Sequence, residues 1–172
     1  ATATSATASD HGISCSSAAV GFADNGEGMA GVAGNCHLIS VNQDWGAAET
    51  EYAELYLWLA GLDADNDAAW FPARLADGAD VISNSFGFSV NSPISALMSD
   101  TFDTVTDDGR DGRGVVLCFS AGNDNVDLDT TNRRPWSMYG RCYGVAAATF
   151  ANDGTTEVKA GYSNFGSTVD FC

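Results

Sequence analysis

The chain has 172 residues, 45% of them hydrophobic, and carries seven Lys and Arg residues against 23 Asp and Glu residues. The resulting formal charge of −16 opposes binding to nucleic acid or to an anionic membrane surface. This length and hydrophobic content suit one well-buried domain. No apolar stretch approaches the roughly 20 residues that a membrane span requires. Such acidity suits a secreted or salt-adapted protein. Five cysteines, an odd number, leave at least one thiol free or paired outside the chain.

The N-terminal part combines a featureless segment with a candidate histidine. Residues 1–9 contain only Ala, Thr and Ser and are expected to form a flexible segment. Asp10, His11 and Gly12 follow and open a small, apolar run over 13–22 that predicts a helix. A histidine at the start of a helix can be held rigidly and still face a cleft. The alternative is a surface histidine beside a capping aspartate.

A glycine-rich loop over residues 23–31 comes next. Its glycines match the GxGxxG spacing, but a dinucleotide site needs a strand before the loop and a helix after it. Here a helical segment precedes the loop and a predicted strand over 36–41 follows it, so that site is excluded. The loop could instead place carbonyl groups and the Asn25 side chain around a calcium ion, with a plain turn as the alternative.

Helical and strand-like patterns then alternate along the chain. The predicted order is a helix over 47–60, an exposed acidic loop over 61–72, a helical segment over 71–76, a strand over 78–88, a helix from Ser92-Pro93 to Gly109, a central strand over 115–119, a polar loop over 124–140, a strand over 142–149 and two short segments within 160–171. Strands that alternate with helices predict an α/β fold with a mainly parallel sheet.

The central strand, Val115 to Phe119, reads as buried on both faces and runs into the small polar residues 120–123. Ligands bind beyond the carboxyl ends of the strands in such sheets. A carboxamide placed there, that of Asn123, can donate a hydrogen bond to an oxyanion. An ordinary Asn turn after a buried strand is the alternative.

Five segments, in order, resemble the subtilisin-like serine peptidases (subtilases). They cover nearly all of residues 10–172. Asp10 to Cys15 resembles the catalytic-histidine motif and Gly31 to Asn35 the turn after it. Ala79 to Gly87 resembles a substrate-binding wall, Gly114 to Asn123 the strand that ends in the oxyanion Asn, and Val145 to Phe171 the run before the family's Ala-Pro-Gly. The resemblance implies one three-layer α/β domain over 10–172, with helices on both faces of a mainly parallel sheet.

The resemblance also implies a polypeptide substrate and a set of roles. His11 would be the general base and Asn123 the oxyanion donor. Ser85, Phe86 and Gly87, facing Ser120, Ala121 and Gly122, would bind the substrate backbone and the residue before the scissile bond. Asn25 would be a ligand of a structural calcium ion. A secreted or extracellular location is expected.

The catalytic triad of this family consists of Asp, His and Ser in chain order, and the resemblance supplies a counterpart in this chain for the His alone. The Asp would precede His11 and the Ser would follow Cys172, so the chain resembles the middle of a catalytic domain. Asp10 cannot easily replace the first, because the side chains of adjacent residues diverge. We therefore expect the chain alone to be inactive and the remaining segments of its parent chain to be its partners. The alternative is a non-catalytic binding or assembly protein with a subtilase-derived fold.

Overall fold

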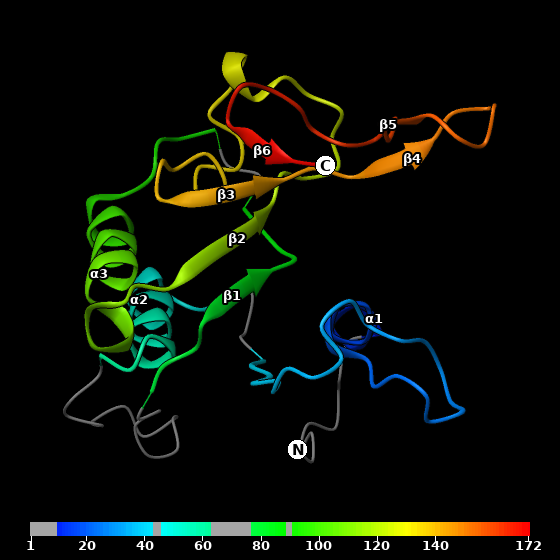
Figure 1. Cartoon of the computed structure of the whole chain (residues 1–172). Helices are drawn as coiled ribbons and strands as arrows, with labels where there is room; N and C mark the ends of the chain where they lie inside the picture. Colours follow the sequence, from blue (N-terminus) through cyan, green and yellow to red (C-terminus); the bar gives the residue numbers. More distant parts are fainter. Residues whose placement is uncertain (1–9, 43–45, 63–76, 89–90) are drawn as a thin grey trace. The chain divides into compact units, whose positions relative to one another are not determined.

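The structure is a computed structural model that describes residues 10–42, 46–62, 77–88 and 91–172. The chain divides into two compact units, residues 1–47 and 48–172 (Figure 1). The expected flexible segment 1–9, most of the acidic loop and the helical segment over 71–76 lie outside the described residues. Among those described, no helix is long and apolar enough to span a membrane.

The first unit contains helix α1, Asp10–Val20, close to its predicted position. The chain then folds back along the helix, and Gly31 N donates to Gly21 O over 2.8 Å. The strand predicted over 36–41 is wrong: this stretch has no strand assignment, and Leu38, Ile39 and Val41 are exposed. A strand is stable only when a neighbour completes its hydrogen bonds, and no strand pairs with this segment among the described residues.

The second unit is built on a four-stranded parallel sheet in the order β1-β2-β3-β6. The strands are β1 Val81–Asn84, β2 Val116–Ser120, β3 Cys142–Val145 and β6 Val169–Phe171. A separate antiparallel hairpin consists of β4 Ala148–Phe150 and β5 Glu157–Lys159 (Figure 1). The α/β class and the mainly parallel sheet are confirmed.

The single strand predicted over 142–149 is divided between two sheets. The division falls at Ala146 and Ala147, which bind different partners. Ala146 N donates to Phe171 O over 2.8 Å, whereas Ala147 N donates to Ser163 Oγ over 2.9 Å. The change of partner redirects the chain into the hairpin.

Two helices belong to this unit, α2 Glu49–Leu59 and α3 Ala96–Gly112. The first matches its prediction. The second begins later than predicted from Ser92-Pro93, because the Ser95 hydroxyl caps it by accepting from Met98 N at 3.2 Å. Regular helical dihedrals end at Gly109, as predicted, where ψ is 152°.

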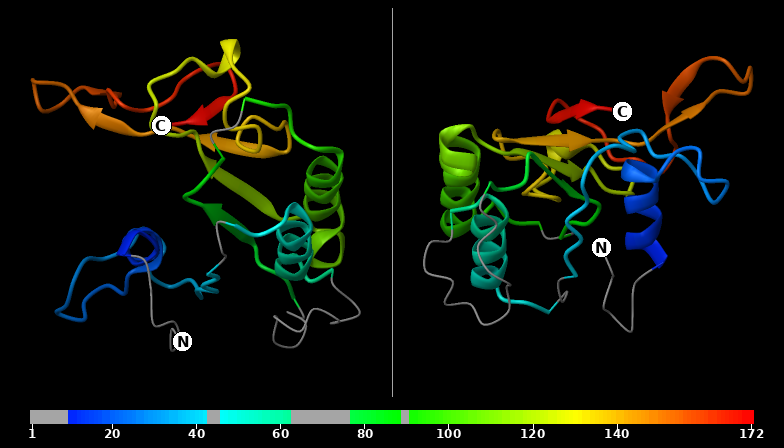
Figure 2. Two further views of the ribbon diagram at one scale, coloured as in Figure 1. Left: turned by 180° about the vertical axis from the view of Figure 1, so that it is seen from behind. Right: turned by 60° about the horizontal axis from the view of Figure 1, so that its bottom comes forward.

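Helices α2 and α3 lie side by side on one face of the sheet (Figure 2). Phe102 of α3 and Tyr56 of α2 both contact Phe119 of β2, with ring centroids 5.6 and 6.3 Å apart. Leu117 and Phe119 are buried there, but Val116 is 42% exposed. The prediction that β2 is buried on both faces is therefore wrong, because helices α2 and α3 both cover the same face.

The other face of the sheet carries exposed apolar side chains from four strands: Val81, Val116, Tyr143 and Phe171. Parallel sheets are normally covered on both faces. Helices over this second face, which the family resemblance implies, remain a prediction.

Candidate functional site

The candidate site lies at the edge of the sheet where β1 and β2 end. The two strands are parallel neighbours, with Asn84 opposite Phe119, so segments 85–88 and 120–123 leave the sheet at the same edge. This is where ligands bind in parallel sheets. The structure thus brings together the two segments that the resemblance assigns to substrate binding.

These two segments supply half of the residues that line a small pocket. It is lined by Phe86, Gly87, Phe88, Phe119, Ser120, Arg134, Trp136 and Ser137. The Trp136 ring packs edge-on against three of the aromatic rings, with centroid separations of 5.0 Å to Phe88, 6.1 Å to Phe119 and 6.3 Å to Phe86. Edge-to-face packing of this kind is favourable and gives the pocket firm aromatic walls.

A buried carboxamide ties the two strands together just before the pocket. Asn84 is 7% exposed; its Oδ1 accepts from the Tyr56 hydroxyl at 2.8 Å, and its Nδ2 donates to Cys118 O at 3.1 Å. Burial raises the pKa of Tyr56 well above its ordinary value, so the phenol stays a neutral donor. Asn84 therefore fixes β1 to both β2 and α2.

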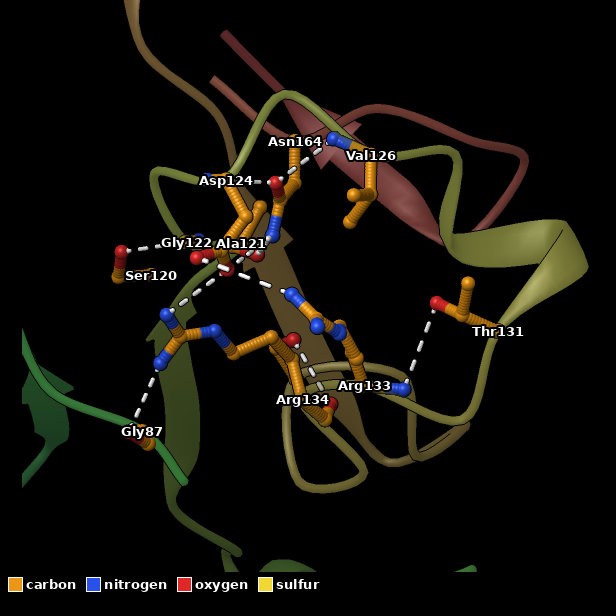
Figure 3. Close-up of polar contacts among 11 residues, drawn as sticks. Gly87, Ser120, Ala121, Gly122, Asp124, Val126, Thr131, Arg133, Arg134 and Asn164 are labelled. Carbon is orange, nitrogen blue, oxygen red and sulfur yellow. Dashed lines mark hydrogen bonds and ion pairs between the residues drawn. The ribbon is translucent and has the colours of Figure 1, made fainter. Parts of the chain in front are cut away.

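A second buried carboxamide holds the loop that follows β2. Asn164 is fully buried, and its Oδ1 accepts from Asp124 N at 2.9 Å and Val126 N at 3.1 Å (Figure 3). Its Nδ2 donates to Ala121 O at 2.8 Å. The oxygen and the nitrogen of this carboxamide therefore bind backbone groups on either side of Asn123. Sequence reasoning placed Asn164 in a turn but assigned it no role.

Asn123 itself is exposed, so its carboxamide is accessible to a bound molecule. It follows Gly122, whose φ of +99° is unfavourable for any other residue. A Cβ on Gly122 would lie 2.6 Å from Asn164 Nδ2 and would also clash with Arg134 Nε. The Arg134 and Asn164 side chains packed against Gly122 therefore fix the backbone position of the next residue, Asn123.

Arg134 was not identified from the sequence, yet its side chain reaches across the site. Its Nη1 donates to Gly87 O at 2.8 Å, and its Nη2 lies 3.2 Å from Asp124 Oδ2 (Figure 3). Its backbone has φ of 64°, a conformation that costs a non-glycine residue on the order of 1 kcal/mol. The available signal was the adjacent arginines Arg133 and Arg134 in a chain with few basic residues.

His11 lies in the first turn of α1, within the first unit, and is exposed. Its Nε2 is 3.8 Å from Cys15 Sγ, one helical turn along. Asn123 belongs to the second unit. The predicted proximity of His11 and Asn123 therefore stays a prediction.

The Asn25 loop fits a calcium ion only in part. Asn25 is exposed, and its Oδ1 accepts from Glu27 N at 2.9 Å in a local turn. Calcium takes six to eight oxygen ligands. The described residues contain no group of three or more His, Cys, Asp or Glu side chains placed to hold a metal ion. Asn25 and nearby carbonyls would need ligands from elsewhere, so no step of the chemistry is assigned to calcium.

One family model matches nearly the whole chain. Residues 1–171 match the sequence profile of the Subtilase family, Peptidase S8. Two curated relatives, each named "Calcium-dependent protease", from Trichormus variabilis and Nostoc sp., are 29% identical over 164 residues. These matches cover 93% of this chain but 22% of each relative, so the chain spans about a fifth of their length. A solved structure described as "Crystal Structure of a Lanthipeptide Protease" is similar over 55% of this chain and 28% of its own, with 22% identity and a TM-score of 0.38.

Proposed function

Because the chain belongs to the subtilase family, we propose that it supplies the general base and the oxyanion donor of a serine-type endopeptidase that hydrolyses peptide bonds in polypeptides. His11 is the base and Asn123 is the donor. One observation supports this assignment most directly. Asn123 is exposed at the carboxyl end of β2, beside a pocket, on a loop held from both sides by Asn164.

In the proposed mechanism, a serine hydroxyl attacks the substrate carbonyl carbon and passes its proton to His11. The carbonyl oxygen becomes an oxyanion and accepts a hydrogen bond from Asn123 Nδ2. His11 then gives the proton to the leaving amine as the C–N bond breaks, and water hydrolyses the acyl-enzyme. The resemblance assigns the serine and the orienting Asp to no residue of this chain. We propose that other segments of the same polypeptide supply both.

The test is a peptide-hydrolysis assay on two preparations. The 172-residue chain alone is expected to show no hydrolysis that titrates stoichiometrically with a serine-directed phosphonate. A longer polypeptide that includes the serine segment is expected to cleave peptides, and Asn123→Ala should lower kcat by roughly 100- to 1000-fold. Asn152→Ala, in the exposed β4–β5 turn, is the matched control. Unchanged kcat in Asn123→Ala would contradict the assignment.

The second candidate is a non-catalytic binding or assembly protein. The observation in its favour is the row of exposed apolar side chains on the second sheet face, such as Val116 at 42% and Phe171 at 57% exposed. The parent open reading frame discriminates between the two. A Gly-Thr-Ser segment soon after Cys172 supports the peptidase, whereas a natural product with an intact mass of 17.8 kDa supports the scaffold.

Two finer proposals accompany the peptidase. Calcium stabilises the protein through the Asn25 loop, a proposal supported by the name of the two relatives, "Calcium-dependent protease". The protein acts outside the cell, which is supported by its formal charge of −16.

A further inference from the structure

Arg134 places a guanidinium group inside the pocket beside Asn123. The group is 14% exposed as a side chain, so it is packed into the protein but still reachable from solvent. It extends from Gly87 O on one wall to Asp124 on the loop after β2 (Figure 3). The pocket as it stands is too narrow to hold a water molecule, so a ligand side chain would lie at its mouth, beside Arg134.

The ion-paired groups at Arg134 sum to a positive charge although the chain as a whole is acidic. Asp124 is the acidic partner, and two arginines face it, Arg134 Nη2 at 3.2 Å and Arg133 Nη1 at 4.0 Å. Asp124 Oδ2 also lies 3.5 Å from Asn164 Nδ2. One carboxylate thus faces two guanidinium groups, which leaves a net charge of +1. This balance favours an anionic ligand and disfavours a lysine or arginine side chain.

The Arg134 guanidinium also retains unused hydrogen-bonding capacity. Its Nε is buried and has no hydrogen-bond partner among the described residues. A guanidinium carries five N–H donors in a rigid fork that matches a carboxylate. The backbone at Arg134 is held at φ of 64°, which fixes the direction of the side chain at a cost in strain. Because Nε is packed under Gly122, the donors left for a ligand are the second N–H groups of Nη1 and Nη2, which Gly87 O and Asp124 do not use.

The position of Arg134 relates this site to one residue of the substrate. Arg134 Nε packs directly under Gly122, the residue before Asn123. In the proposed function, Asn123 Nδ2 holds the oxygen of the carbonyl under attack. In the substrate residue that contains this carbonyl, the side chain is attached to the Cα atom, which is bonded directly to the carbonyl carbon. The pocket with Arg134 is therefore within reach of that side chain.

We propose that Arg134 makes this site select an acidic side chain, glutamate or aspartate, on the residue immediately before the cleaved bond. The inference rests on the proposed function, since that function places the reacting carbonyl at Asn123. The substrate carboxylate accepts hydrogen bonds from the Arg134 guanidinium and displaces Asp124 in part. Phe86 and Phe88, which are half-buried at the pocket, pack against the methylene groups of the substrate side chain.

A binding experiment on the 172-residue chain tests selection without catalysis. The probes are two fluorescein-labelled tetrapeptide amides that differ only in their last residue, Glu or Gln, followed by fluorescence anisotropy. We expect the Glu peptide to bind at least tenfold more tightly, because only its ionised carboxylate forms charge-assisted hydrogen bonds. Arg134→Gln should remove this difference. Arg141→Gln is the matched control, since it removes the same charge from an exposed ion pair with Asp107 and should keep the difference.

A second variant protects the test against misfolding of Arg134→Gln. Asp124→Asn leaves the arginine in place and removes the carboxylate that competes for it, so the Glu peptide should bind several-fold more tightly than to the unmodified chain. Equal binding of both peptides to the unmodified chain, or weaker binding of the Glu peptide to Asp124→Asn in a chain with an unchanged melting temperature, would overturn the inference.

Cleavage by the longer polypeptide separates this inference from the proposed function. Matched substrates carry Glu, Gln, Leu or Lys before the scissile bond, and Glu is expected to give the highest kcat/KM. If the Glu peptide binds selectively but no substrate is cleaved, the peptidase proposal fails and the anion site stands. Cleavage that favours Leu or Lys, with the same preference in Arg134→Gln, overturns the inference and leaves the peptidase proposal intact.

Discussion

The Nδ2 atom of Asn164 donates to the carbonyl oxygen of Ala121 over 2.8 Å, so a residue close to the last strand holds the loop after the central strand. The Oδ1 atom of the same side chain accepts from two further amides of that loop. The geometry around Asn123 is therefore decided by a residue 41 positions later in the chain.

Asn164→Ala is predicted to destabilise the protein markedly. It removes the bonds to Ala121 O, which is buried, and to the part-buried amides of Asp124 and Val126. An unsatisfied buried group costs about 1–3 kcal/mol, and a part-buried group costs less because water can replace its partner. We expect the free energy of unfolding to fall by about 2–4 kcal/mol in a urea titration. The control Asn152→Ala, on an exposed turn, should change it by less than about 0.5 kcal/mol. Equal stabilities for the two variants would show that the Asn164 contacts do not stabilise the fold.

Gly122→Ala is predicted to disturb the loop after β2 directly. The added methyl group would meet Arg134 and Asn164 at a residue held at φ of +99°. The strain alone should cost on the order of 1–3 kcal/mol in the free energy of unfolding. Gly140→Ala is the control, because a Cβ there has no neighbour within 4 Å. A thermal melt in which Gly122→Ala matches Gly140→Ala would contradict the packing described for Gly122.

His11 and Asn123 are predicted to open onto one concavity, with segment 85–87 on its wall. Their polar atoms should lie roughly 5–10 Å apart, because a reacting carbonyl must fit about 3 Å from each partner. A crystal structure of the longer polypeptide with a peptide-derived boronic acid bound would measure this distance. A separation beyond about 15 Å without a shared pocket would refute both site assignments.

Calcium is predicted to raise the melting temperature by mass action if Asn25 and neighbouring carbonyls bind it. Because the Asn25 Oδ1 already accepts from Glu27 N, the shift in the 172-residue chain is expected to be small. A calorimetric melt at millimolar calcium measures this shift, and Asn25→Ala should reduce it. Magnesium at the same concentration serves as the ionic-strength control. The same melting temperature with and without calcium would remove this proposal.

The five cysteines, all free thiols, are predicted to react unequally with iodoacetamide. Cys36 and Cys172 are exposed, whereas Cys142 is buried. Burial, followed by the neighbouring Cys118 and Asp103, raises the pKa of Cys142 from 9.0 to about 12. At pH 8 we expect rapid alkylation of the two exposed thiols and none at Cys142 until urea unfolds the chain. Mass spectrometry of the labelled peptides gives the order, and early labelling of Cys142 in the folded chain would contradict it.

The raised pKa of Cys142 also predicts a pH dependence of stability. Because the folded-state pKa lies above the unfolded one, the unfolded chain loses its proton first as the pH rises. The contribution of Cys142 is fully present below pH 9 and is lost between pH 9 and about 12. Cys142→Ala should flatten this decline in alkaline urea titrations relative to the unmodified chain, and an identical decline in both would contradict the assignment to Cys142.

The sequence by itself determined the elements whose residues carry their own periodic or chemical signal. The helical spacing of Tyr52, Leu55, Tyr56 and Leu59 predicted α2, and the short apolar runs predicted β1 and β2, because these patterns reflect which side chains must leave water. The polar residues after β2 likewise marked Asn123 as a candidate, since parallel strands present ligand sites at their carboxyl ends.

Only the tertiary structure decided which residues support the site. Asn164, Arg134 and Gly122 meet under Asn123 through contacts that span up to 43 positions, and no local pattern encodes such contacts. The same limit explains the errors at 36–41 and at Val116. Apolar sequence favours a strand, but a partner strand and a covering layer decide whether it forms and which face is buried.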